Sequence, residues 1–248
     1  MKMRIVLLGA AAPLVLLAGC SGGKSDNNEY SDMNVTANDT SATANAFADV
    51  EQKMNEAMMS AVGSDAGQNW AKKMIAHHKG AIDMSNVLLA QNPTPDVAQM
   101  ARETIAKQQK DIANIQKLVK DGAADQKSAD LYRPAMTEMQ QKMQAASGAD
   151  ASETYMRKML EHHKGAVAMS DVALKNGVSG ALRAQVQKTR DDNQKDAAMV
   201  EAMLGGQSMS QAMAGSGAKS ANQAKAEPAP ADKAMDMNAM GNISTNHM

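Results

Sequence analysis

An internal repeat is the feature that most constrains the fold of this chain. The sequence matches itself at a constant offset of 85 residues, from Phe47, which pairs with Tyr132, to Asp111, which pairs with Asp196. Within the match, "KKMIAHHKGAIDMS" returns as "RKMLEHHKGAVAMS". Such self-similarity indicates a duplicated structural unit that buries its apolar face against its own copy. The two units, residues 46–122 and 131–205, are therefore expected to form one domain, 46–205.

Each unit is predicted to contain three helices. The sequence has neither the period-two alternation nor the β-branched runs that are typical of strands. The first helix is expected over roughly 46 to 60, and the second starts at a capping-box pattern formed by Asp65 and Gln68. Thr94 is predicted to cap the third helix, which ends near Gly122.

Short connections between long helices favour antiparallel neighbours, so each unit supplies a helical hairpin preceded by a short leading helix. One hairpin buries too little apolar surface to be stable alone, and two hairpins together make a four-helix bundle. The predicted fold is all-α, a four-helix bundle built from two duplicated hairpins.

The first residues predict export and lipidation. Residues 1–19 have a basic start at Lys2 and Arg4 and an apolar run too short to span a bilayer comfortably, as in a signal peptide. Leu17 to Cys20 resembles the lipobox of bacterial lipoproteins, which implies cleavage before Cys20 and acylation of that residue. Lipid would then attach the chain to the membrane. Ser21 resembles an outer-membrane sorting signal, which implies a lipoprotein of the outer membrane that faces the periplasm, and an inner-membrane destination stays open. Residues 20–45 are polar, and residues 206–248 are rich in Met, Ala and Ser; they are expected to be a disordered tether and a disordered tail.

Composition narrows the function. The formal net charge is −1 and no basic stripe is visible, which argues against binding to nucleic acid. No nucleophile set, phosphate loop or cofactor fingerprint is visible either, so the chain is predicted to bind rather than catalyse. The unusual features are 23 methionines and 5 histidines, four of which form two adjacent pairs.

The histidine pairs border the predicted buried face of their helix. On a wheel of about 100° per residue, His77 and Met84 share one flank of the stripe centred on Met74, and His78 lies on the other. Buried imidazole needs a partner, and thioether sulfur one turn away is the group on offer. Imidazole with thioether suits Cu(I), and by the same reasoning Ag(I). The predicted ligands are Met74, His77, His78 and Met84, with Met159, His162, His163 and Met169 in the second unit.

A di-iron oxidase is a rival interpretation, because such bundles use Glu-x-x-His on facing helices. Here the residue three positions before the first histidine is Met74 or Met159, a soft donor where iron favours oxygen. Glu161 is adjacent to His162, but its counterpart is Ala76. The sequence therefore favours copper over iron.

A non-metal interpretation stays open, in which the histidines are hydrogen-bonded across the bundle and the protein is an envelope scaffold or interaction module. Methionine also fills cores, and packing is the prediction for the first-helix methionines. The methionines and the histidine in the tail have two interpretations: they capture copper loosely, or they belong to a low-complexity extension without a binding role. The first-helix residues are Met54, Met58, Met139 and Met143, and those of the tail are Met235, Met237, Met240, His247 and Met248.

The repeated pattern resembles domain-of-unknown-function family 305, secreted helical proteins of the ferritin-like superfamily that include CopM-type periplasmic copper-binding proteins. Its signature is an aromatic residue, Met-x-x-His-His, a small pair and a further Met. The resemblance implies that the eight histidines and methionines are copper ligands. The third helix departs from the family pattern, and the prediction places no ligand there. The signature reads Trp70, Met74, His77, His78, Ala81 and Met84, and again Tyr155, Met159, His162, His163, Ala166 and Met169. On the third helix, where the family tends to carry Gln-x-x-Glu-Ile, this chain has Gln108, Asp111 and Ile112, and in the second unit Asn193, Asp196 and Ala197.

The sequence leaves several points open. It does not determine the oligomeric state, the number of metal ions, or whether the two arrays share ions. It also leaves open whether the role is storage, tolerance, or delivery to a copper-handling protein partner.

Overall fold

The computed structural model describes residues 36–217, with side chains from residue 46 onward, and within these ranges its regular elements are all helices. The predicted all-α helical bundle is confirmed. In chain order the elements are α1 (Thr36–Ser60), α2 (Ala66–Leu89), α3 (Pro95–Gln116), α4 (Gln126–Ala129), the 3-10 turn η1 (Asp130–Tyr132), α5 (Arg133–Ala145), α6 (Ala151–Lys175), α7 (Gly180–Leu204) and α8 (Met209–Ser216).

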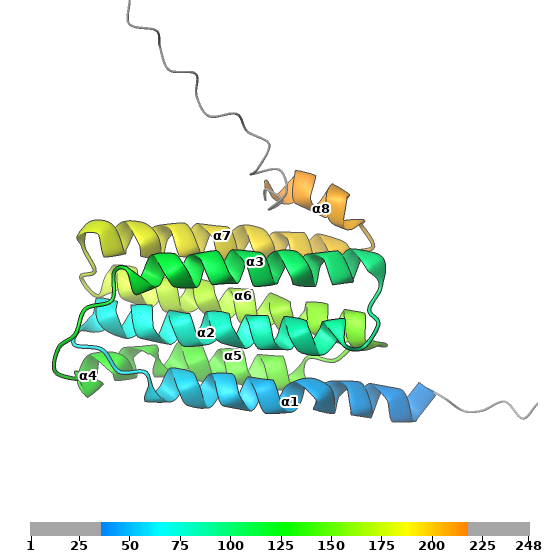
Figure 1. The fold of residues 1–248 in the computed structure, drawn as a ribbon, viewed down its shortest axis with the longest axis horizontal. Coiled ribbons are helices and arrows are strands. Elements are labelled where there is room, and N and C mark those ends of the chain that lie inside the picture. The colour runs from blue at the N-terminus through cyan, green and yellow to red at the C-terminus, as the bar shows by residue number, and fades with distance from the viewer. Residues whose placement is uncertain (1–35, 218–248) are drawn as a thin grey trace, which may run out of the picture. The chain divides into compact units, whose positions relative to one another are not determined.

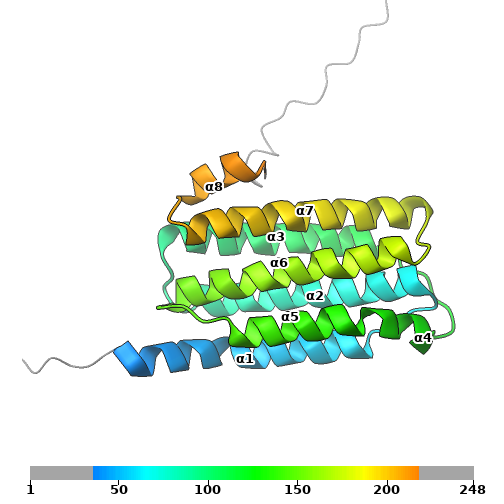
Figure 2. The same cartoon turned by 180° about the vertical axis from the view of Figure 1, so that it is seen from behind.

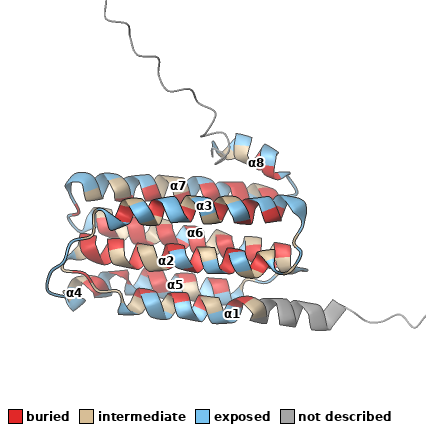
Figure 3. Cartoon of the chain, in the orientation of Figure 1, coloured by how far each residue is buried: buried red, intermediate tan, exposed pale blue. Residues whose placement is uncertain are grey.

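The long helices form two rows packed back to back. Helices α1, α2 and α3 lie side by side in one row, and α5, α6 and α7 form the matching row behind it (Figures 1 and 2). The rows meet where α2 packs on α6, with further contacts between α1 and α5 and between α3 and α7. The two predicted hairpins, α2 with α3 and α6 with α7, are present and form the expected four-helix bundle. The leading helices α1 and α5 pack on the α2 and α6 side of this bundle as a further layer. Helices α2 and α6 are therefore covered on several sides, and buried residues recur along both (Figure 3).

The predicted helix starts are mostly correct. Asp65 Oδ1 accepts a hydrogen bond from the Gln68 backbone N–H at 2.8 Å, and Asp150 caps α6 in the same way. Helix α3 starts at Pro95 as expected, but the Thr94 side chain makes no capping hydrogen bond. Instead, the Thr94 backbone N–H donates to Ser152 Oγ of α6 at 3.0 Å, which ties the two units together.

Three boundaries differ from the prediction. Helix α3 ends at Gln116 rather than near Gly122. Helix α1 begins at Thr36, about ten residues before the expected start and inside the predicted tether. Helix α8 lies inside the predicted tail, where Ser208 and Gln211 form a capping box and the Met209 N–H donates to Asp96 Oδ2. The capping pattern at Ser208 was available in the sequence, but the Gly-rich and Ala-rich surroundings masked it.

The core is rich in methionine and is held together by reciprocal contacts between the units. Trp70 Nε1–H donates to Ser170 Oγ at 3.2 Å, and the Tyr155 and Ser85 hydroxyls lie 2.7 Å apart. These are matching positions of the two units with their roles exchanged. The first-helix methionines predicted to pack in the core are buried: Met54, Met58, Met139 and Met143.

Several predictions concern residues outside the described ranges. The signal peptide 1–19, lipidation of Cys20, and the tail residues Met235, Met237, Met240, His247 and Met248 all lie there. None of the described helices combines the length and the apolar character that crossing a membrane requires.

Candidate metal-binding site

The eight predicted ligands lie on the two central helices, α2 and α6, where these pack against each other. Every one of them is buried, and the most exposed, His163, retains only 2 % of its accessible surface. The helical wheel placed the histidines at the borders of the buried stripe. In the structure, these borders are buried as well, because other helices pack around α2 and α6. The first array is Met74, His77, His78 and Met84, and the second is Met159, His162, His163 and Met169.

The structure brings the two arrays together through their first histidines. The rings of His77 and His162 are stacked, with centroids 3.5 Å apart and an interplanar angle of 24°. Nε2 of His77 lies 3.1 Å from the backbone oxygen of His162, and Nε2 of His162 lies 3.1 Å from that of His77. The arrays therefore adjoin across the contact between α2 and α6.

These reciprocal hydrogen bonds fix the tautomer of both rings. A carbonyl oxygen only accepts, so Nε2 of each ring must carry the proton and donate it. In the neutral ring the lone pair then resides on Nδ1. Nδ1 of His77 and Nδ1 of His162 are both buried and have no hydrogen-bonding partner. His77 and His162 thus each hold an imidazole lone pair that the protein itself leaves unused.

The second histidines of the two arrays differ in their partners. Nδ1 of His163 lies 2.8 Å from Oδ1 of Asn193 on α7. His78, at the matching position, is buried with neither ring nitrogen hydrogen-bonded. Within each pair the ring centroids are 5.8 Å apart for His77 and His78 and 5.7 Å apart for His162 and His163.

Burial keeps the histidines neutral. It lowers the pKa of His78 to about 3, with the neighbouring His163 and Lys107 adding to the shift. The pKa values of His77 and His162 lie well below their ordinary value for the same reason, reinforced by the other histidines. The pKa of His163 is also lowered by burial, although Asp196 and the Asn193 hydrogen bond oppose the shift. Protons therefore do not compete for the free lone pairs near neutral pH.

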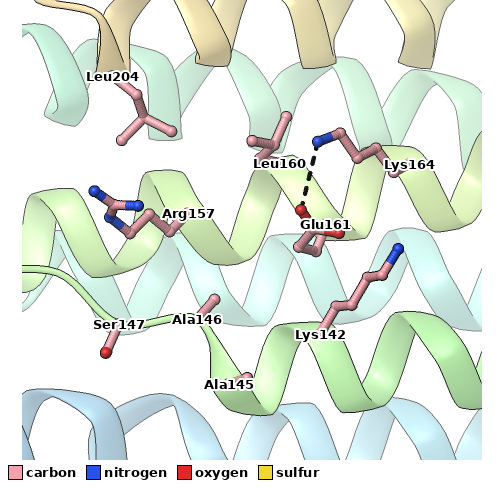
Figure 4. A pocket seen from close by; sticks show the side chains of 9 residues that line it. All are labelled: Lys142, Ala145, Ala146, Ser147, Arg157, Leu160, Glu161, Lys164 and Leu204. Atoms are coloured by element: carbon pink, nitrogen blue, oxygen red, sulfur yellow. Dashed lines mark hydrogen bonds and ion pairs between the residues drawn. The ribbon is translucent and has the colours of Figure 1, made fainter.

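The donor set is nitrogen and sulfur rather than oxygen. Among residues 46–217, no three His, Cys, Asp or Glu side chains converge so that they could hold a metal ion. A metal ion at either array would need the adjacent thioethers to complete its coordination. Glu161, the carboxylate nearest in sequence, instead lies near Lys164 (Figure 4).

The sequence prediction missed the contribution of the third helices. Gln108 of α3 and Asn193 of α7 are both buried, and they occupy matching positions of the two units. Lys107 of α3 forms an ion pair with Asp196 of α7 close to the second histidines. The signal that could have identified these residues is the repeat offset itself, which pairs Gln108 with Asn193 and Asp111 with Asp196.

Two surface hollows lie along α5, α6 and α7. One, of about 430 Å³, is bordered by Lys142, Arg157, Glu161 and Lys164 on α5 and α6 (Figure 4). The second is bordered by residues of α6 and α7, including Asp171 and Arg190. Neither is lined by a predicted metal ligand. The candidate site is a packed interior, because all eight predicted ligands are at most 2 % exposed.

The fold and the site define an all-α protein whose central helices present paired histidines and methionines to its core. The chain belongs to the family described as Domain of unknown function (DUF305), which matches residues 21–119, 119–204 and 152–248. Among solved structures, it is similar to one described as a candidate secreted DUF305 protein from Streptomyces coelicolor. That match has 18 % identity and a TM-score of 0.42, and it covers 63 % of this chain and 96 % of the other. No match was found among curated proteins.

Proposed function

We propose that this protein binds Cu(I), with Ag(I) as a surrogate, through the two His/Met arrays on α2 and α6. The observation that carries the proposal is the set of buried, unpartnered ring nitrogens: Nδ1 of His77, both nitrogens of His78 and Nδ1 of His162. A buried polar atom without a partner costs about 1 to 3 kcal/mol. A bound metal ion would remove this cost.

The chemistry of the donors supports a soft ion. The unpartnered nitrogens are neutral imidazole lone pairs, because burial lowers the pKa of His77 and His78. Thioether sulfur and imidazole nitrogen favour Cu(I) over hard ions such as Mg²⁺ or Ca²⁺. Met74 and Met84 are both buried on the same helix as these histidines. The copper ion is the cargo of the protein, and no reaction is proposed.

The cellular role we propose is copper sequestration, tolerance or delivery to a copper-handling protein in the cell envelope. The export signal and the lipobox at Cys20 support a lipoprotein of the outer membrane that faces the periplasm. A ferritin-like di-iron oxidase has less support. Met74 stands where that class carries a carboxylate, and the described part of the chain offers no cluster of three His, Cys, Asp or Glu side chains.

A second candidate function is a helical scaffold without metal. The observation in its favour is the stacked pair His77 and His162, each of which already donates one hydrogen bond to the other helix. On this interpretation the rings act as packing elements between α2 and α6. It gives no account of the ring nitrogens of His78, which have no partner.

Anaerobic competition with a Cu(I) chelator tests the proposal. The copper-free protein is titrated beside a quadruple variant carrying His77→Ala, His78→Ala, His162→Ala and His163→Ala. The wild type is expected to hold copper more tightly than the variant by at least about a hundredfold. His247→Ala is the matched control, since it removes a histidine that belongs to neither array, and it should bind as the wild type does.

Elemental analysis of protein purified from copper-fed cells separates the candidate functions. Copper in the wild type and its loss from the quadruple variant are expected. Equal chelator competition by both proteins would instead favour the scaffold. Iron in place of copper, together with oxygen consumption, would favour the di-iron oxidase.

A further inference from the structure

The contacts of Asn193 determine the protonation of the His163 ring. The Asn193 side-chain Nδ2 donates to the Thr189 backbone oxygen at 2.8 Å, which fixes the orientation of the carboxamide. Its Oδ1, 2.8 Å from Nδ1 of His163, must therefore accept. Nδ1 of His163 carries the proton, and the lone pair of the neutral ring resides on Nε2. Among the described residues none hydrogen-bonds to that Nε2.

Gln108 occupies the matching position in the first unit but makes no matching contact. Its side chain is buried, and its Oε1 has no hydrogen-bonding partner. His78, the histidine it would serve, is buried with both ring nitrogens unpaired. In the first unit, Gln108 Oε1 and the ring N–H of His78 thus both lack a partner. In the second unit, the matching side chains of Asn193 and His163 form a hydrogen bond. The ring of His78 is left without a partner that selects its tautomer or its orientation.

We propose that the two arrays are unequal, and that Asn193 is a positioning residue that presents Nε2 of His163 to the metal ion. This inference rests on the proposed function. The second array takes the first Cu(I) ion, because its ring is already oriented in the metal-free protein. The first array binds more weakly, since His78 must be ordered as the ion arrives. Pairing of Gln108 Oε1 with Nδ1–H of His78 then accompanies binding.

Stepwise Cu(I) titration of the full chain under anaerobic chelator competition tests the proposal. The wild type should show two separable affinities. Asn193→Leu keeps the side-chain size and removes the acceptor, and it should weaken the tighter step by about 10- to 100-fold. Gln108→Met is the matched change in the first array, and it should leave the tighter step unchanged. Asn193→Asp restores an acceptor, and its affinity should return to within a few-fold of the wild type.

A second readout does not depend on copper. ¹⁵N NMR of the metal-free wild type should show His163 protonated at Nδ1, and Asn193→Leu should abolish this preference while the helical circular dichroism is retained. Equal affinities of the two steps, an unchanged tighter step in Asn193→Leu, or an Nε2-protonated His163 would overturn the positioning role and leave copper binding intact. A wild type that binds no copper would overturn the proposed function, and this inference with it.

Discussion

At the scale of single residues, the core buries several groups that can ionise. The four paired histidines and two lysines, Lys73 and Lys158, are all at most 2 % exposed. Burying a group that can ionise costs free energy unless it stays neutral or finds a partner. The histidines stay neutral, and the lysines are hydrogen-bonded to backbone oxygens. The free energy of unfolding should therefore respond to pH, which charges the histidines, and to substitutions that remove a partner of a buried lysine.

Acid should destabilise the copper-free protein well above the pH at which carboxylates titrate. The pKa of His78 is about 3 in the folded protein, against an ordinary value of 6.5. A lowered histidine pKa contributes full stability above 6.5, and that stability is lost as the pH falls from 6.5 toward 3. Each such histidine should lower the free energy of unfolding by about 1.4 kcal/mol per pH unit below 6.5.

Urea unfolding of the copper-free protein between pH 7 and pH 5 measures this slope. His78→Leu should reduce the dependence of the free energy of unfolding on pH by the contribution of that one histidine. A free energy of unfolding that is constant over this range would contradict the buried, neutral histidines.

One buried ion pair breaks the symmetry of the repeat. Lys158 lies 2.7 Å from Glu51, whereas Lys73 is held by the backbone oxygens of Met58 and Ala61, each at 2.9 Å. Residue 136, the counterpart of Glu51, is methionine. Lys158 therefore depends on a carboxylate that the first unit's lysine does without.

Glu51→Met should lower the free energy of unfolding by about 3 to 5 kcal/mol, because it leaves the buried Lys158 ammonium without its counter-charge. Urea unfolding measures the change. The double variant Glu51→Met with Lys158→Met replaces both charges with apolar groups and should recover most of the loss. If the double variant is no more stable than the single one, the ion pair is not the cause.

At the scale of elements, glycine sets how closely each leading helix approaches its histidine helix. A Cβ at Gly80 of α2 would overlap the side chain of Met54 on α1, and a Cβ at Gly165 of α6 would overlap that of Met139 on α5. The two glycines occupy matching positions and follow the histidine pairs by two residues. The absence of a side chain at these glycines therefore lets α1 pack closely on α2, and α5 on α6.

Gly80→Ala and Gly165→Ala should each destabilise the protein by about 1 to 3 kcal/mol through overpacking. This sign is opposite to that of helix propensity, which favours alanine by about 1 kcal/mol. Thermal unfolding followed by circular dichroism measures the difference. Gly215→Ala in α8 is the control, since nothing lies near its added Cβ, and it should cause no loss. Stabilisation by either of the first two changes would contradict the close approach.

At the scale of the whole molecule, the two units depend on each other. Each contributes its histidine helix to the contact between α2 and α6, and the contacts across it are reciprocal: His77 with His162, and Trp70 and Tyr155 with serines of the opposite unit. In these contacts, a buried polar group of one unit finds its hydrogen-bonding partner in the other. Neither unit would keep these partners alone.

Residues 36–122 and 123–217, produced separately, should each lack cooperative unfolding as monomers, since each exposes the face that α2 or α6 buries. Mixing them in equal amounts should restore helicity and a single transition, measured by circular dichroism and by size in solution. A cooperative monomeric transition of residues 36–122 alone would contradict this dependence.

The sequence by itself determined the helical class, most helix boundaries, the core role of the first-helix methionines and the eight candidate ligands. These follow from local signals, namely capping residues, helical periodicity and a repeat offset that can be counted. Only the tertiary structure decided how His77 stacks on His162, which ring nitrogens remain unpaired, and that Asn193 rather than Gln108 completes a hydrogen bond to its histidine. Those outcomes depend on the angle and distance at which α2, α6 and α7 pack. Packing of that kind is set by side-chain volumes across the whole core and not by any one segment of the chain.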